Sequence, residues 1–145
     1  MPALRYDCSC TKGGTIMVQI RIGNITWNVY AVDRDSEKLQ RDDDEAVMGI
    51  TYFQEAEIYI CTERTNADIL RRTILHELCH AALFSRGFTP SGMDEEDICN
   101  FFESNAVDLC AQAGIVYNAL IAESQSAGTE ALLGRMYTAQ RPAMA

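Results

Sequence analysis

Residues 73–82 read TILHELCHAA and lie in the middle of a segment whose apolar residues recur at helical spacing. Thr65-Asn66 before it suits an N-cap, and Gly87 after it suits a stop. The sequence therefore predicts one helix from about residue 66 to residue 86. Residues i and i+4 of a helix lie one turn apart on the same face, so we expect the imidazoles of His76 and His80 to reach one point in space.

The pattern H-E-x-x-H at residues 76–80 is typical of a zinc site on a helix. Neutral imidazole nitrogens suit Zn²⁺, and we expect His76 and His80 to be its ligands. Glu77 would lie beside the ion, where it can accept a proton from the bound water and so act as the catalytic base. The alternative is that both histidines are ordinary helix residues. They are the only two in the chain, which favours a joint role.

A catalytic zinc site has three protein ligands and one open position. Since there is no other histidine, the third ligand must be a carboxylate or a cysteine. We favour a carboxylate from the acidic start of the next predicted helix. Within it we favour Glu95, because Glu95 shares a face with Ile98 and Phe102. We expect that face to pack against the motif helix. Glu96 and Glu103 remain open as alternatives, and Cys99 is a weaker one.

Two stretches before the motif alternate as strands do. Residues 15–22 and 25–32 flank Gly23-Asn24, which predicts a hairpin with a two-residue turn. Shorter strands are expected at residues 47–53 and 56–61, where Ile58 and Ile60 alternate with polar or aromatic neighbours. The acidic run at residues 42–45, between the hairpin and these shorter strands, is interpreted as a solvated loop, because it lacks the spacing of a calcium site. We predict an α+β fold in which a small twisted sheet packs on the motif helix.

A second helix is expected from about Met93, with a stop or kink at Gly114. We predict one domain over residues 1–122 and a weakly ordered C-terminal tail over residues 123–145. Cys8 and Cys10 form a C-x-C pair, a spacing that can bind metal. The oligomeric state does not follow from the sequence.

The chain has 145 residues with 12 Lys and Arg against 21 Asp and Glu, which gives a net charge of −9. Such a charge is unfavourable for binding a phosphate backbone or an anionic membrane, so neither nucleic acid nor a membrane is expected as a partner. The N-terminus lacks the apolar stretch of a secretory signal. We therefore expect a cytoplasmic protein whose six cysteines are reduced thiols.

The segment from Ile58 to Ile98, with its H-E-x-x-H helix and downstream acidic residues, resembles small zincin metallopeptidase-like proteins, many of them encoded by phages and prophages. It is similar to the ImmA/IrrE and SprT-like groups, although the E-x-E-A-N run of the ImmA type is absent. The resemblance implies two histidine ligands, a glutamate base, a downstream glutamate ligand and a bacterial host cell as the location. It also implies that the strand at residues 58–61 lines the cleft. Tyr52 and Tyr59 are candidates for stabilising an oxyanion, although each is more typical of a packed strand.

These features predict a zinc-dependent metallopeptidase, a hydrolase whose substrate is a peptide or protein. Zinc would polarise the scissile carbonyl while Glu77 takes a proton from the attacking water. The alternative is a regulatory or interaction module that binds zinc and has little or no peptidase activity.

Overall fold

The first hairpin forms where the alternating residues predict it. In the computed structural model of the chain, which describes residues 16–42 and 46–139, β1 (Met17–Ile22) pairs antiparallel with β2 (Ile25–Val32). Ile22 lies opposite Ile25, so the turn between them has two residues. Gly23 takes a φ of 60°, the left-handed conformation that such a turn requires and that glycine adopts without a steric cost.

Two further strands complete a four-stranded mixed sheet in the order β1-β2-β4-β3. β4 (Glu57–Cys61) pairs parallel with β2 and antiparallel with β3 (Gly49–Tyr52), and a short 3-10 helix, η1 (Glu37–Leu39), precedes β3. The α+β class is thus confirmed. β4 lies inside the sheet with a partner on each side, whereas β3 is an edge strand within the described residues.

The two faces of the sheet have different environments because side chains alternate along each strand. One face packs against the helices and forms the main core, with Trp27, Val29, Ile58 and Ile60 fully buried. The opposite face carries a smaller cluster in which Leu39 of η1 covers Tyr59 and Cys61. The expected alternation of residues 57–60 between two faces is confirmed.

The motif helix, α1 (Ala67–Ser85), begins and ends close to the predicted positions. The side chain of Asn66 accepts a hydrogen bond from the backbone N–H of Ile69 at 2.9 Å, which satisfies one of the free donors at the helix start. Gly87 follows the last turn with a φ of 74°, as a helix C-cap glycine does. Ile74 and Leu78 are fully buried and anchor α1 in the core.

The second helix, α2 (Glu95–Ala139), is longer than the sequence predicts. It begins after a short 3-10 turn, η2 (Pro90–Gly92), at a reciprocal cap in which Asp94 and Asp97 each accept a hydrogen bond from the other's backbone N–H. The expected stop at Gly114 is wrong, because α2 is continuous there, and the alternative of a kink stays a prediction. Helical backbone also continues through residues 123–139, which are rich in the helix formers alanine, leucine and glutamate. The domain boundary at residue 122 stays a prediction.

The buried face of α2 differs from the predicted one. Ile98 and Phe102 are 54% and 65% exposed, so the expectation that they pack against the motif helix is wrong. The buried stripe lies on an adjacent face that includes Phe101, Asn105 and Leu109. Asn105 can be buried because its side-chain amide donates to the carbonyl of Phe101 at 2.8 Å.

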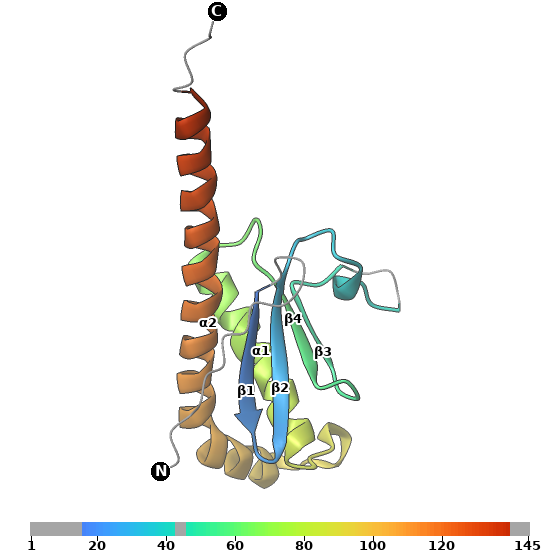
Figure 1. The fold of residues 1–145 in the computed structure, drawn as a ribbon. Coiled ribbons are helices and arrows are strands. Elements are labelled where there is room, and N and C mark those ends of the chain that lie inside the picture. The colour runs from blue at the N-terminus through green and yellow to red at the C-terminus, as the bar shows by residue number, and fades with distance from the viewer. Residues whose placement is uncertain (1–15, 43–45, 140–145) are drawn as a thin grey trace, which may run out of the picture.

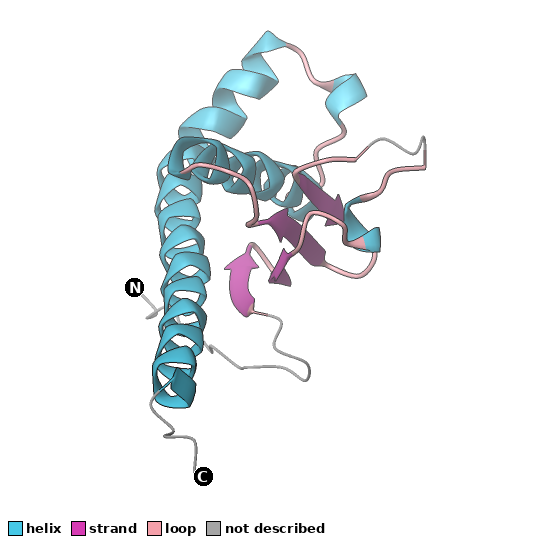
Figure 2. Ribbon diagram, turned by 90° about the horizontal axis from the view of Figure 1, so that it is seen from above, coloured by secondary structure: helices cyan, strands magenta, loops and turns pink. Residues whose placement is uncertain are grey.

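The elements form two layers. α1 crosses one face of the sheet, and α2 runs alongside α1 and the β1 edge, with its C-terminal turns extending beyond the rest of the fold (Figure 1). The view from above shows the strands together on one side of the two helices (Figure 2). None of the helices in the described part of the chain combines the length and apolarity needed to cross a membrane.

Candidate metal centre

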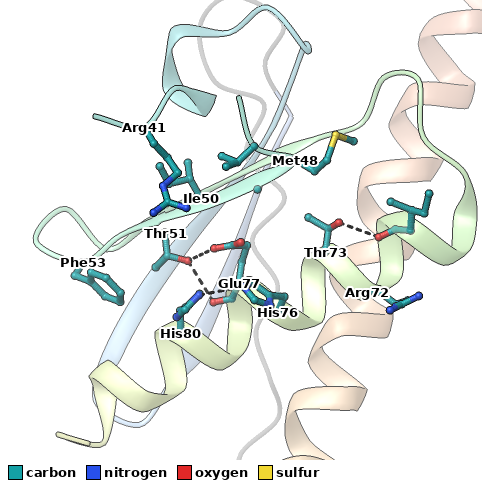
Figure 3. Close-up of a pocket in the computed structure, with 13 residues that line it drawn as sticks. Arg41, Met48, Ile50, Thr51, Phe53, Arg72, Thr73, His76, Glu77 and His80 are labelled. Atoms are coloured by element: carbon teal, nitrogen blue, oxygen red, sulfur yellow. Dashed lines mark hydrogen bonds between the residues drawn. The ribbon is translucent and has the colours of Figure 1, made fainter. Parts of the chain in front are cut away.

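The two motif histidines converge on one point beside α1. Their Nε2 atoms lie 3.1 Å apart, and their rings meet edge to face with centroids 4.8 Å apart and planes at 82°. Both side chains are exposed and project from α1 toward the space under β3 (Figure 3). The convergence follows from the i, i+4 spacing, as the sequence predicts.

The separation of the two nitrogens suits joint binding of a metal ion. Zinc–nitrogen bonds of about 2.0–2.1 Å at a tetrahedral angle place two ligating nitrogens about 3.3–3.4 Å apart. The observed 3.1 Å between the Nε2 atoms is within a few tenths of an ångström of this value. In the absence of an ion, the same distance fits a hydrogen bond in which one ring donates from Nε2 and the other accepts. The pair thus fits zinc as two of its ligands.

Glu77 lies on the side of α1 that faces β3, and only 5% of its surface is exposed. The hydroxyl of Thr51 on β3 donates to its carboxylate oxygen Oε2 at 2.7 Å (Figure 3). The same hydroxyl lies 3.3 Å from the backbone carbonyl oxygen of Glu77. The edge strand therefore fixes the position of the carboxylate that the sequence predicts as the catalytic base.

Gly49 allows this close approach between β3 and α1. A Cβ atom at Gly49 would lie 2.8 Å from Cγ2 of Thr73, 2.9 Å from Cγ of Glu77 and 3.1 Å from its Oε1. Contacts below 3.0 Å are not tolerated between carbon atoms, so any larger residue would force the side chains of Thr73 and Glu77, or the backbone, to move. The glycine is needed for space here, rather than for an unusual backbone angle.

A cavity of about 800 Å³ opens between β3, the segment before it and α1. Its walls are largely apolar or neutral, and its charged lining residues are Arg41, Arg72 and Glu77. His76 and His80 lie in its floor with Glu77, and Phe53 closes one end (Figure 3). The volume is that of a typical ligand site.

The structure does not bring the predicted third ligand to the histidine pair. Glu95, Glu96 and Glu103 are exposed, and none of them lines the cavity. Among residues 16–42 and 46–139, no group of three histidine, cysteine, aspartate or glutamate side chains is placed to hold a metal ion. The assignment of Glu95 rested on the packing of Ile98 and Phe102, which the structure does not show.

Several predicted features lie outside the described residues. Cys8 and Cys10 belong to residues 1–15, and residues 43–45 of the acidic run are also outside the described part of the chain. Their predicted roles, a possible metal site and a solvated loop, stay predictions.

The strand that lines the cavity is β3, and the implication that residues 58–61 would do so is wrong. Those residues belong to β4, whose two edges are occupied by β2 and β3.

Tyr52 and Tyr59, the candidates for stabilising an oxyanion, do not lie in the cavity floor, because both belong to the opposite face of the sheet. The hydroxyl of Tyr52 donates to the carbonyl of Lys38 at 2.8 Å, and that of Tyr59 donates to Glu57 at 2.6 Å.

Sequence reasoning missed the residues that hold Glu77 from the strand side. Gly49 and Thr51 are two positions apart, so both side chains point to the same face of β3. This alternation was visible in the sequence, but only the sheet order shows that the face looks toward α1.

No protein-family model matches the chain, and comparison with curated proteins and with solved structures found no match. The resemblance to zincins therefore stays a prediction from the motif.

Proposed function

We propose that the protein is a zinc-dependent hydrolase that cleaves peptide bonds. The observation that carries this proposal is the arrangement of three side chains on α1: two Nε2 atoms 3.1 Å apart and, between them in sequence, a nearly buried glutamate. A structural histidine pair would not need a carboxylate fixed at its side by an opposing strand. Zinc with neutral imidazoles and a neighbouring general base is a combination suited to hydrolysis.

The residues divide the work as follows. His76 and His80 would hold the zinc ion, which when bound supplies Lewis acidity for the carbonyl and for a water molecule. Glu77 accepts the proton of the attacking water and later returns it to the leaving amine. The hydroxyl of Thr51 donates a hydrogen bond to Oε2 of Glu77, which leaves Oε1 to take the proton.

The edge position of β3 supports an extended peptide as the substrate. Edge strands carry backbone N–H and C=O groups that a peptide can pair with, and β3 runs directly above the cavity floor. A peptide bound along β3 would have its backbone over His76 and His80.

The test is Glu77→Gln, with Glu57→Gln as the matched control. Glu57 is also a hydrogen-bonded carboxylate on a strand of the sheet, but its partner Tyr59 lies on the face away from the cavity. We expect the zinc-loaded Glu77→Gln protein to keep its zinc and to lose at least about 100-fold in the rate of peptide cleavage, as loss of a general base does. Glu57→Gln should cleave at the wild-type rate. Equal rates for wild type and Glu77→Gln would refute the proposal.

A second candidate function is a zinc-binding regulatory or interaction module without peptidase activity. It is favoured by one observation, that the described residues bring together no group of three candidate metal ligands. In that case the wild type and Glu77→Gln would bind zinc and a protein partner equally, and neither would cleave peptides. A structural zinc at Cys8 and Cys10 is tested separately by the zinc content of the double Cys→Ser variant.

A further inference from the structure

We propose that Phe53 and Phe84 form an apolar subsite beside the histidine pair, which takes an aromatic or large aliphatic side chain next to the scissile bond. The inference rests on the proposed function and adds the substrate class. It starts from two large apolar side chains that the fold leaves 40% exposed.

The two rings belong together and adjoin the candidate metal centre. Their centroids lie 5.1 Å apart with planes tilted by 34°. Phe53 also meets His80 edge to face, with centroids 6.4 Å apart, and it lines the cavity. Phe84 follows His80 by one helical turn on the same face of α1. A side chain seated on the two rings would therefore be next to the group bound at His80.

The subsite has a rigid base. Trp27, which is fully buried, meets Phe84 edge to face with centroids 6.0 Å apart. Its indole N–H donates to the hydroxyl of Ser85 at 2.9 Å, which ties the end of α1 to β2. Because the indole ring of Trp27 cannot move without losing its hydrogen bond to Ser85, it holds Phe84 in place before any ligand arrives.

Phe53 is held from the other side by the turn between β3 and β4. Its carbonyl accepts a hydrogen bond from the N–H of Ala56 at 3.4 Å, and Ala56 takes a φ of 53° to close the turn. Since Phe53 directly follows β3, a peptide that pairs with this edge strand would pass along its ring. The subsite is thus continuous with the binding path proposed above.

The chemistry of the two rings determines which side chains they accept. Burying an apolar side chain against them removes apolar surface of both partners from water, which is favourable. Aromatic side chains gain more through edge-to-face or offset contacts. A polar or charged side chain would lose its hydration without finding a hydrogen-bonding partner on the rings. Phe, Tyr, Trp, Leu and Met are the side chains that fit.

The test compares two zinc-binding probes, acetohydroxamate and 3-phenylpropanohydroxamate, which differ in their apolar group. We expect the zinc-loaded wild type to bind the phenyl compound about tenfold more tightly. This ratio of dissociation constants should fall close to one in Phe53→Ala and in Phe84→Ala. Phe102→Ala is the matched control, because Phe102 is an exposed phenylalanine on α2. Its ratio should equal that of the wild type.

The outcomes separate the subsite from the proposed function. A ratio that is the same in the wild type, Phe53→Ala and Phe84→Ala overturns the subsite, whether or not the protein cleaves peptides. If zinc does not bind, the proposed function fails, and the subsite is judged by the aromatic NMR signals of Phe53 and Phe84. N-acetylphenylalanine amide should then shift these signals and N-acetylalanine amide should not, and the absence of a difference overturns the subsite.

Discussion

Replacing Gly49 with alanine tests whether the edge strand β3 must touch α1. The new Cβ would lie 2.8 Å from Cγ2 of Thr73 and 2.9 Å from Cγ of Glu77. Overpacking of this kind costs about 1–3 kcal/mol, because the neighbours or the backbone must move. Alanine recovers about 0.5–1 kcal/mol by restricting the unfolded chain. The net loss of unfolding free energy is therefore about 0–2.5 kcal/mol.

Gly114→Ala is the matched control for this substitution. It lies inside α2, and a Cβ there would meet no atom within 4 Å. Alanine should stabilise the helix by about 0.8–1 kcal/mol relative to glycine. At about 3–4 °C per kcal/mol for a chain of this size, Tm should fall by up to about 10 °C in Gly49→Ala and rise by about 3 °C in Gly114→Ala.

Calorimetry or thermal circular dichroism measures both changes of Tm. Gly49→Ala should also lower the rate of peptide cleavage, because Glu77 is pushed away from the hydroxyl of Thr51. If the two alanine variants were equally stable and cleaved at equal rates, the reasoning from the contact between β3 and α1 would be refuted.

Three further predictions follow from other contacts. Thr51→Val should lower the unfolding free energy measured in urea by about 1–3 kcal/mol, because it leaves the nearly buried carboxylate of Glu77 without its hydrogen-bond donor. Thr51→Ser keeps a hydroxyl and should have nearly the wild-type stability. Equal losses in the two variants would contradict this prediction. Burial and the neighbouring carboxylate of Glu57 raise the pKa of Tyr59 above its ordinary value of 10, so the folded state holds the phenol proton more tightly. The unfolding free energy should therefore fall as the pH rises above about 10, and it should fall less steeply in Tyr59→Phe than in the wild type. Identical slopes of unfolding free energy against pH in the two proteins would contradict this prediction. Glu95→Ala should bind zinc within about twofold of wild type in competitive titrations, since Glu95 is exposed outside the cavity, and a tenfold loss would restore it as the third ligand.

The local elements were predictable because their signals lie within a few residues. The Gly23-Asn24 turn is marked by a dipeptide with strands alternating on both sides. The motif helix is marked by an N-cap residue, a regular apolar spacing and a terminal glycine. The convergence of His76 and His80 follows from helix geometry alone.

The order of the strands was not predictable in the same way. β3 precedes β4 in the chain but lies outside it, at the edge of the sheet. This placement depends on contacts between residues far apart in the chain. Because the edge strand, rather than the one before the helix, forms the cavity wall, Gly49 and Thr51 did not stand out in the sequence.

The sequence predicts the wrong buried face for α2, and Asn105 shows the physical reason. Two stripes at i, i+4 spacing compete in this helix, and the one through Ile98 and Phe102 has the more uniform apolar composition. The buried stripe contains Asn105, which looks unsuitable for a core until its hydrogen bond to the carbonyl of Phe101 is known. A polar residue that is satisfied within its own helix can be buried at little cost.

X-ray absorption spectroscopy at the zinc edge identifies the atoms bound to zinc and so tests whether His76 and His80 hold it. With the protein loaded with one equivalent of zinc, we expect two imidazole nitrogens at about 2.0–2.1 Å, with the remaining ligands being oxygen. The imidazole signal should halve in His80→Ala. Sulfur ligands at about 2.3 Å, or a spectrum unchanged in His80→Ala, would contradict the account.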